Sequence, residues 1–168
     1  MRISGAELAF AEDETYQVLA GVFGDAEAAD ELAPDLHLLT HGWPALVGLA
    51  GAWLGQQPAE ERRERLRALA RVDGDLGEHL VPAVVAGLDG EERELVRRLA
   101  RLPWVNAALA DRLDLTEDLE AVAPFVQSVA RRPGWFAVPD GWRRPLQREL
   151  PMTDAEVATL QEAYAAAT

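Results

Sequence analysis

The sequence predicts a mainly α-helical fold, in which a helical subdomain is followed by a winged-helix-like module with a small β-hairpin. Three observations support this prediction. Apolar residues recur at intervals of three and four through most of the chain, as they do on one face of a helix. Glycine, proline and helix-capping side chains separate these segments. Only over residues 135–144 does the pattern become that of two short strands joined by a turn.

Residues 1–73 are predicted to form the helical subdomain. After an irregular lead-in of ten residues, the expected helices span 12–23, 26–32, 34–39, 45–54 and 59–72. Gly24 ends the first of them and Asp25 is a suitable N-cap for the second. Pro34 is expected to divide the following segment, because proline disrupts a helix interior. Pro44 suits the first turn of the almost wholly apolar helix that follows.

Residues 74–168 are predicted to form the winged-helix-like domain. Its expected helices span 76–88, 91–102, 106–113, 116–130 and 154–167. Pro82 means that the first of these helices either starts late or kinks. Asn106, Thr116 and Thr153 are suitable N-caps for the last three.

The expected hairpin pairs residues 135–138 with residues 142–144 across a Pro-Asp-Gly turn. Trp135 and Trp142 would then face each other, which contributes ~0.5–1 kcal/mol for a cross-strand pair. Tryptophan and arginine are over-represented at interface hot spots, so we expect an exposed patch here to bind a protein partner. The residues of this predicted interaction patch are Arg131, Arg132, Trp135, Trp142 and Arg143. Contact of the same patch with nucleic acid is the alternative.

Composition excludes several classes of protein. All 16 basic residues are arginine, and a P-loop needs a lysine on the nucleotide phosphates, so the chain is not a P-loop ATPase by itself. Cysteine is absent, which removes disulfides and thiolate chemistry. The longest apolar stretch is too short to span a bilayer and there is no signal-peptide pattern, so we expect a cytoplasmic protein that makes no membrane contact.

Charge is unevenly distributed along the chain. The net charge is −13, and residues 1–50 hold nine acidic residues and one arginine. Residues 93–150 hold eight acidic residues and ten arginines. Because affinity for DNA comes largely from basic groups that neutralise phosphates, DNA is not expected as a partner of the whole domain.

No arrangement of side chains predicts catalysis or metal binding. His37 and His41 have the i, i+4 spacing of a zinc pair, but Gly42 and Pro44 break the helix at once and no third ligand follows. The acidic residues 12–14 fall in a first helical turn, where the helix dipole favours carboxylates. We therefore expect no enzymatic activity and no metal.

Two stretches resemble a part of the STAND regulatory ATPases of the maltose-regulator type, which occur in large LuxR-type and actinobacterial transcription regulators. One stretch is Glu7-Leu8-Ala9-Phe10 with Glu12 and Glu14; the other is Thr40-His41-Gly42-Trp43-Pro44-Ala45-Leu46 with Leu49-Ala50. Residues 77–88, 91–102 and 134–146 are similar to later lines of the family. In these proteins a helical subdomain and a winged helix follow an ATPase core.

The resemblance implies a non-catalytic regulatory module that covers the nucleotide of an ATPase core and relays its state. ATP or ADP would be bound only together with a separate P-loop core, which would precede residue 1. Gly42, Trp43 and Pro44 would lie next to the nucleotide, with Pro44 against its base. Arg144 stands where the family has a phosphate-sensing histidine, and an arginine can also contact phosphate.

Two other hypotheses remain open. The chain could be a stand-alone protein-interaction adaptor of the same fold that uses no nucleotide. A weak winged-helix DNA binder is the third hypothesis, and its phosphate contacts would have to come from residues 93–150.

Overall fold

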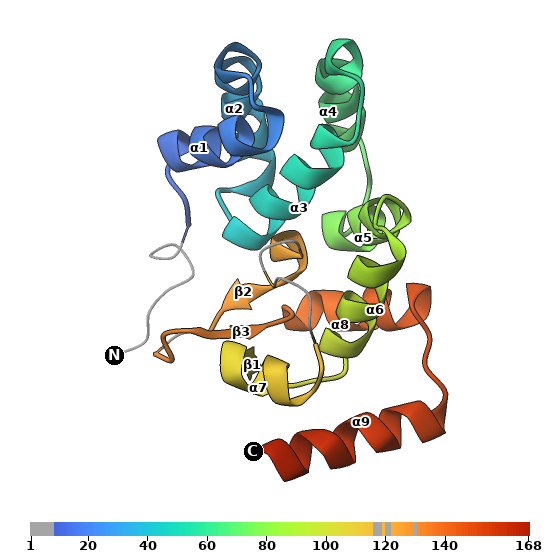
Figure 1. Cartoon of the computed structure of the whole chain (residues 1–168). Coiled ribbons are helices and arrows are strands. Elements are labelled where there is room, and N and C mark those ends of the chain that lie inside the picture. The colour runs from blue at the N-terminus through green and yellow to red at the C-terminus, as the bar shows by residue number, and fades with distance from the viewer. Residues whose placement is uncertain (1–8, 116–118, 120–121, 130) are drawn as a thin grey trace. The chain divides into compact units, whose positions relative to one another are not determined.

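The computed structural model describes residues 9–115, 119, 122–129 and 131–168, and most of them are helical (Figure 1). Nine α-helices and a three-stranded antiparallel sheet lie within these residues, which confirms the mainly helical class with a small sheet. The chain divides into two compact units, Met1–Val84 and Val85–Thr168. The division lies within α5 (Leu76–Ala86), further along the chain than the boundary predicted after residue 73.

The described part of the first unit is helical. Its elements are α1 (Glu12–Phe23), α2 (Ala26–Thr40), α3 (Pro44–Gly55), the 3-10 turn η2 (Ala59–Glu61), α4 (Arg62–Ala70) and most of α5. Gly24 ends α1 in the left-handed conformation, with φ 64°. The Asp25 carboxylate caps α2 by accepting hydrogen bonds from the Glu27 and Ala28 amides at 3.0 and 3.2 Å. Both predictions at this turn are confirmed.

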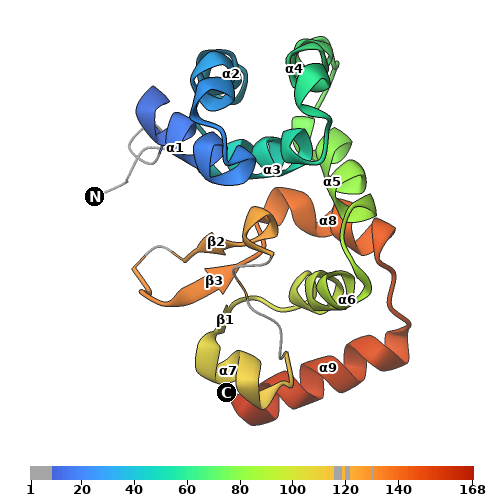
Figure 2. The same cartoon turned by 45° about the horizontal axis from the view of Figure 1, so that its top comes forward.

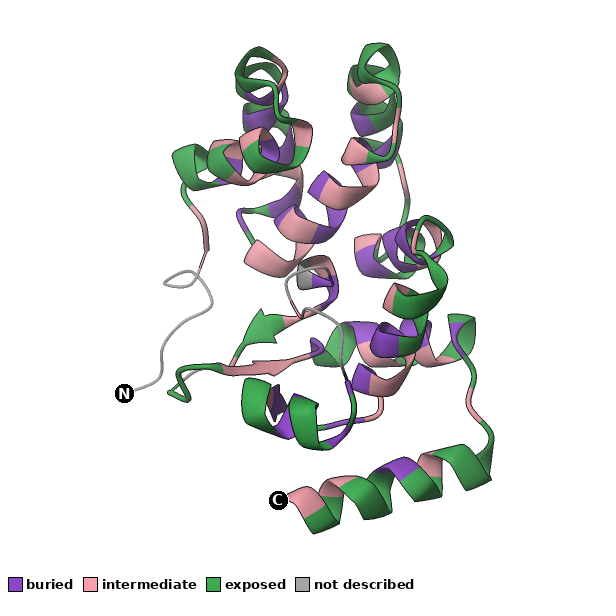
Figure 3. Cartoon of the chain, viewed as in Figure 1, coloured by how far each residue is buried: buried purple, intermediate pink, exposed green. Residues whose placement is uncertain are grey.

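The first three helices share one apolar core. Leu19 of α1, Leu36 of α2 and Leu49 of α3 are each fully buried. α1 and α2 pack closely along their lengths, because their buried residues recur at helical spacing on facing sides. Figure 3 shows the buried residues of these helices in purple.

The prediction that Pro34 divides its segment is wrong, because α2 continues through it without interruption. Pro34 and Asp30, the residue whose carbonyl loses its helical hydrogen bond, are both exposed. Water can satisfy that carbonyl, so the proline costs less here than it would in a buried helix. Pro82 also lies inside a helix, and α5 starts at Leu76 rather than after the proline.

The second unit alternates helices with three very short strands (Figure 2). Its elements are α6 (Gly90–Leu99), β1 (Val105–Asn106), α7 (Ala107–Arg112), the 3-10 turn η3 (Ala123–Phe125), β2 (Gln127–Ser128), β3 (Trp135–Ala137), α8 (Asp140–Glu149) and α9 (Asp154–Ala167). The sheet order is β1-β3-β2, and Phe136 of β3 is opposite both Val105 and Ser128. A strand between two helices that joins a later hairpin is the winged-helix arrangement.

The predicted position of the hairpin is wrong, although a hairpin is present. Residues 135–137 do form a strand, but residues 142–144 lie in α8. The Trp142 amide donates to the Pro139 carbonyl at 2.9 Å, so the Pro-Asp-Gly segment starts a helix instead of a tight turn. α8 buries Trp142, Pro145 and Leu146, which share one helical face. The strand that forms the hairpin with β3 is β2, which lies within a segment predicted to be helical to residue 130.

Capping side chains start two helices of this unit as predicted. The Asn106 side chain accepts a hydrogen bond from the Leu109 amide at 2.8 Å. Thr153 caps α9 by accepting from the Glu156 amide, while Glu156 accepts from the Thr153 amide at 2.7 Å, as in a capping box. The predicted cap at Thr116 lies outside the described residues.

Candidate functional site

The hairpin of β2 and β3, here called the wing, is closed by a tight backbone turn. The Val129 amide donates to the Trp135 carbonyl at 2.8 Å, and the Arg132 amide donates to the Val129 carbonyl at 3.1 Å. Arg131 has φ 64°, a left-handed conformation that non-glycine residues seldom adopt. The backbone therefore holds Arg131 and Arg132, both exposed, at the end of the hairpin.

Arg132 lies within cation–π distance of two indole rings. Its guanidinium carbon is 4.7 Å from the ring centre of Trp104 and 5.8 Å from that of Trp135. The Tyr164 hydroxyl donates to the Trp104 carbonyl at 3.0 Å, and burial raises the pKa of Tyr164 while the charge of Arg132 opposes that rise. We call Trp104, Arg132, Trp135 and Tyr164 the aromatic–arginine cluster. Its cation–π contacts orient the guanidinium plane.

This cluster has the chemistry of an anion-binding surface. The Arg132 N–H groups make no hydrogen bond with other described residues, and Trp104 is 38% exposed. A guanidinium that lies over aromatic rings still has N–H groups that can bind a carboxylate or a phosphate. The arrangement can therefore bind an acidic side chain or a phosphate group.

Two residues of the predicted interaction patch lie elsewhere. Trp142 is 1% exposed and packs in the core, because α8 is a helix and not the second strand of a hairpin. Arg143 donates to the carbonyls of Leu102 and Pro103 at 2.7 and 3.1 Å, so it holds the chain that follows α6. Trp135, Arg131 and Arg132 do lie together at the wing.

Sequence reasoning missed Trp104 and Tyr164. Trp104 immediately precedes β1, and its neighbour Asn106 is paired with Trp135 in the sheet. Prediction of β1 as a partner of β3 would have brought the two tryptophans together. Tyr164 reaches the cluster from α9, and no local pattern indicates such a contact.

The segment between α7 and β2 is acidic. Residues 113–126 contain four acidic residues and no basic one. The described part of this segment includes the 3-10 turn η3. Four carboxylates disfavour contact with a phosphate backbone here.

The Gly-Trp-Pro turn of the first unit connects α2 to α3. Gly42 has φ 68°, and a side chain there would collide with the Phe10 carbonyl. The Gly42 carbonyl accepts from the Phe10 amide at 2.7 Å, so the glycine is required for close backbone packing. Pro44 is the first residue of α3, and Trp43 is 45% exposed.

The predicted nucleotide-adjacent residues belong to different units. Gly42, Trp43 and Pro44 lie in Met1–Val84, and Arg144 lies in Val85–Thr168. Arg144 is exposed on α8 and has no polar contact with the other described residues. Its guanidinium is available to bind an anion.

The histidines predicted to be unable to form a metal site have other roles. Nδ1 of His37 lies 3.3 Å from the hydroxyl of Thr15, and His41 ends α2 in a left-handed conformation. Within the described residues there is no group of three or more histidine, cysteine or acidic side chains suited to a metal ion.

An open pocket of about 250 Å³ between α1 and α2 is lined mainly by acidic side chains and Tyr16.

Comparison with models of known protein families, with curated proteins and with solved structures returned no match. No helix in the described part of the chain is both long and apolar enough to cross a lipid bilayer.

Proposed function

We propose that this chain is a non-catalytic regulatory module of a cytoplasmic STAND-type transcriptional regulator. In this role it covers the nucleotide of an ATPase core and relays the nucleotide state by binding that core or another protein segment. The order of its parts, a helical unit followed by a winged-helix unit, supports the proposal. ATP or ADP enters only through a separate P-loop core, since the chain contains no lysine.

The observation that favours protein binding over DNA reading is the distribution of charge in the second unit. The wing presents Arg131 and Arg132 next to exposed Trp104, whereas residues 113–126 are acidic. Arginine and tryptophan are common in the energetically dominant part of protein interfaces. A winged helix of this kind is suited to binding a carboxylate-bearing protein surface by its wing.

Nucleotide release from the core tests the regulatory role. The P-loop segment from the same reading frame or a neighbouring gene would be purified with and without this chain, and release of a fluorescent ADP would be timed. We expect the chain to slow release at least about fivefold, as in a modest allosteric coupling. Pro44→Ala and Arg144→Gln should reduce the effect, and Arg65→Gln on the exposed face of α4 is the matched control. An unchanged release rate would contradict the proposal.

A stand-alone adaptor without nucleotide is the second candidate. The observation that favours it is the packing of Gly42 against Phe10, which accounts for this glycine without any nucleotide. The reading frame and its neighbours discriminate between the two candidates, since the adaptor needs no Gly-x-x-x-x-Gly-Lys-Ser/Thr line nearby. Calorimetry of the isolated chain with ATP should show no heat of binding, and micromolar affinity would contradict both candidates.

A DNA-binding wing is the third candidate, and Arg131, Arg132 and Trp135 are the observation in its favour. Fluorescence anisotropy with a short duplex at low salt tests it. We expect no binding, because the acidic residues outnumber the basic ones in the chain as a whole. Salt-dependent binding that Arg132→Gln abolishes would overturn this expectation.

A further inference from the structure

The C-terminal helix α9 is attached to the second unit with very little apolar burial. Of its 14 residues only Leu160 is buried, and most of the others are exposed (Figure 3). Residues 151–168 contain three acidic residues and no basic one. A helix of this length is marginal without tertiary contacts, so the polar contacts at its two ends decide whether it stays in place.

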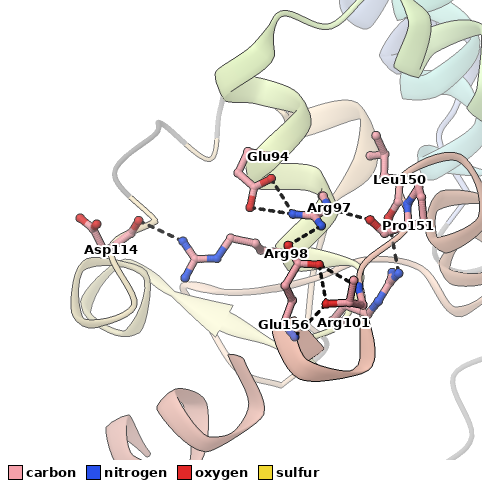
Figure 4. Close-up of polar contacts among 9 residues, drawn as sticks. Glu94, Arg97, Arg98, Arg101, Asp114, Leu150, Pro151 and Glu156 are labelled. Atoms are coloured by element: carbon pink, nitrogen blue, oxygen red, sulfur yellow. Dashed lines mark hydrogen bonds and ion pairs between the residues drawn. The ribbon is translucent and has the colours of Figure 1, made fainter. Parts of the chain in front are cut away.

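These contacts join α9 to a basic surface. Arg97 donates to the Glu156 carboxylate and to the Pro151 carbonyl, both at 2.8 Å (Figure 4). At the other end of the helix, Arg112 donates to the Ala167 carbonyl at 2.9 Å. Between them, the Tyr164 hydroxyl donates to the Trp104 carbonyl. We call the surface formed by Arg97, Arg101, Trp104 and Arg112 the α9 face.

One of the three arginines on the α9 face, Arg97, forms an ion pair with a described carboxylate of α9. Arg101 reaches only the Leu150 carbonyl, at 3.4 Å, and its second terminal nitrogen is buried without a hydrogen-bond partner among the described residues. Burial and the neighbouring charge of Arg97 lower the pKa of Arg101. Glu156 of α9 pairs with Arg97, and no ion pair joins Arg101 to an acidic side chain in the part of the chain that the structure describes.

We propose that the α9 face is a docking surface for an acidic amphipathic helix of a partner protein, and that α9 covers this surface until that helix replaces it. The contacts of α9 show which groups this surface accepts. The Glu156 carboxylate pairs with Arg97, and the Leu160 side chain is buried. The Tyr164 hydroxyl donates to the Trp104 carbonyl. A DNA backbone offers neither an apolar side chain nor a hydroxyl donor along the strand, because its phosphates only accept hydrogen bonds. The α9 face shares Trp104 with the aromatic–arginine cluster. Its three arginines lie outside that cluster, and its test changes no residue of the wing.

A labelled peptide with the sequence of residues 150–168 is the probe. It would be titrated, by fluorescence anisotropy, into the full chain and into the double variant Glu156→Gln/Leu160→Ser, which loosens the chain's own α9. We expect the double variant to bind the peptide at least about tenfold more tightly, because its surface is open in a larger fraction of molecules. The matched control Glu162→Gln/Ala163→Ser alters exposed positions of the same helix and should bind like the unmodified chain.

Adding Arg97→Gln to the double variant should abolish most of the gained affinity. Circular dichroism and a thermal melt would establish that each variant is folded. Equal binding of the unmodified chain and the double variant would overturn the proposal. So would equal binding of a scrambled peptide of the same composition, or tighter binding of a short duplex DNA than of the peptide.

Hydrogen exchange of the unmodified chain gives a second test that needs no substitution. We expect the amides of α9 to exchange at least about a hundredfold faster than those of α6, through local opening that leaves the rest of the unit folded. Equal protection of α9 and α6 would show that α9 does not leave the surface separately, which would overturn the proposal.

Discussion

The two units of the molecule use arginine in different ways. In the first unit, Arg65 pairs with Glu61 at 3.0 Å and Arg67 with Glu64 at 3.9 Å, and all four side chains are exposed. In the second unit, arginines donate to backbone carbonyls that are distant along the chain. Examples are Arg98 to Leu113 at 2.7 Å, Arg97 to Pro151 at 2.8 Å and Arg143 to Leu102 at 2.7 Å.

The difference follows from how each unit provides hydrogen-bond donors for its backbone carbonyls. Helices of the first unit satisfy most carbonyls internally, so their arginines are left for surface ion pairs, which contribute little to stability. The second unit has short strands and many connecting segments, whose carbonyls need other donors. A charged donor to a carbonyl shielded from water contributes more than an exposed ion pair. The first unit therefore depends mainly on apolar packing, and the second depends also on its arginines. Arg62, which donates to the Leu54 carbonyl at 3.1 Å, is an exception in the first unit.

The largest expected effect is the loss of the buried indole of the second unit. Trp142→Ala should lower the free energy of unfolding by about 4 kcal/mol, because it removes a large core side chain that is 1% exposed. Urea denaturation measures this change. Trp43→Ala, at a site that is 45% exposed, is the control and should cost less than about 1.5 kcal/mol. Equal losses would refute the burial of α8 described above.

The next effect concerns the close packing of the first unit. Gly42→Ala should cost about 2–3 kcal/mol, since it combines a left-handed conformation with a collision against the Phe10 carbonyl. Gly21→Ala is the matched control, because Gly21 is exposed in α1 with open space around it. That substitution should stabilise the protein by ~0.5–1 kcal/mol in the same denaturation experiment. A stabilising Gly42→Ala would contradict the contact with Phe10.

The contrast between the arginines is tested by a pair of matched substitutions. Arg143→Met should cost about 2 kcal/mol, because it leaves the Leu102 and Pro103 carbonyls without their donor. Arg65→Met should cost less than about 0.5 kcal/mol, because it removes an exposed ion pair within one helix. Thermal and urea unfolding of both variants measures the difference. Similar losses of unfolding free energy in the two variants would show that arginines stabilise the two units to the same extent.

The smallest expected effect is a response of α9 to acid. The hydrogen bond from Arg97, together with those from Thr153, lowers the pKa of Glu156 from 4.5 to about 2. Because the folded pKa lies below the unfolded one, the stabilisation is complete above about pH 4.5 and is lost as the pH falls towards 2. The protection factors of the α9 amides, in which the intrinsic exchange rate at each pH is divided out, should therefore fall over this range. Glu156→Gln should remove most of this fall, and Glu162→Gln should retain it.

Local signals in the sequence predicted most helices correctly. Gly24 and Asp25 define the turn between α1 and α2, and Asn106 and Thr153 cap the helices that they were expected to cap. The hairpin was misplaced because Pro139 to Gly141 suits both a turn and a helix start. The burial of Trp142 decides in favour of the helix, and this tertiary contact leaves no mark on the local sequence.

The candidate site was predictable only where it is local. Arg131, Arg132 and Trp135 are close in sequence and lie at the wing, where both arginines are exposed and Trp135 is half-buried. Trp104 and Tyr164 are 60 residues apart, yet they share a hydrogen bond. Such a contact depends on how α9 lies across the unit, which a single sequence does not reveal.

The guanidinium of Arg143 donates to two successive carbonyls, and this geometry determines what replacement of Arg143 by lysine would do. A lysine ammonium is a compact charge on a flexible stem, and it cannot reach both oxygens with the fixed geometry of a planar guanidinium. A guanidinium also keeps its proton in strong alkali, where an ammonium would lose it. The contacts that join distant segments of the second unit should accordingly persist at high pH, and replacement of Arg143 by lysine should make the unit sensitive to alkali.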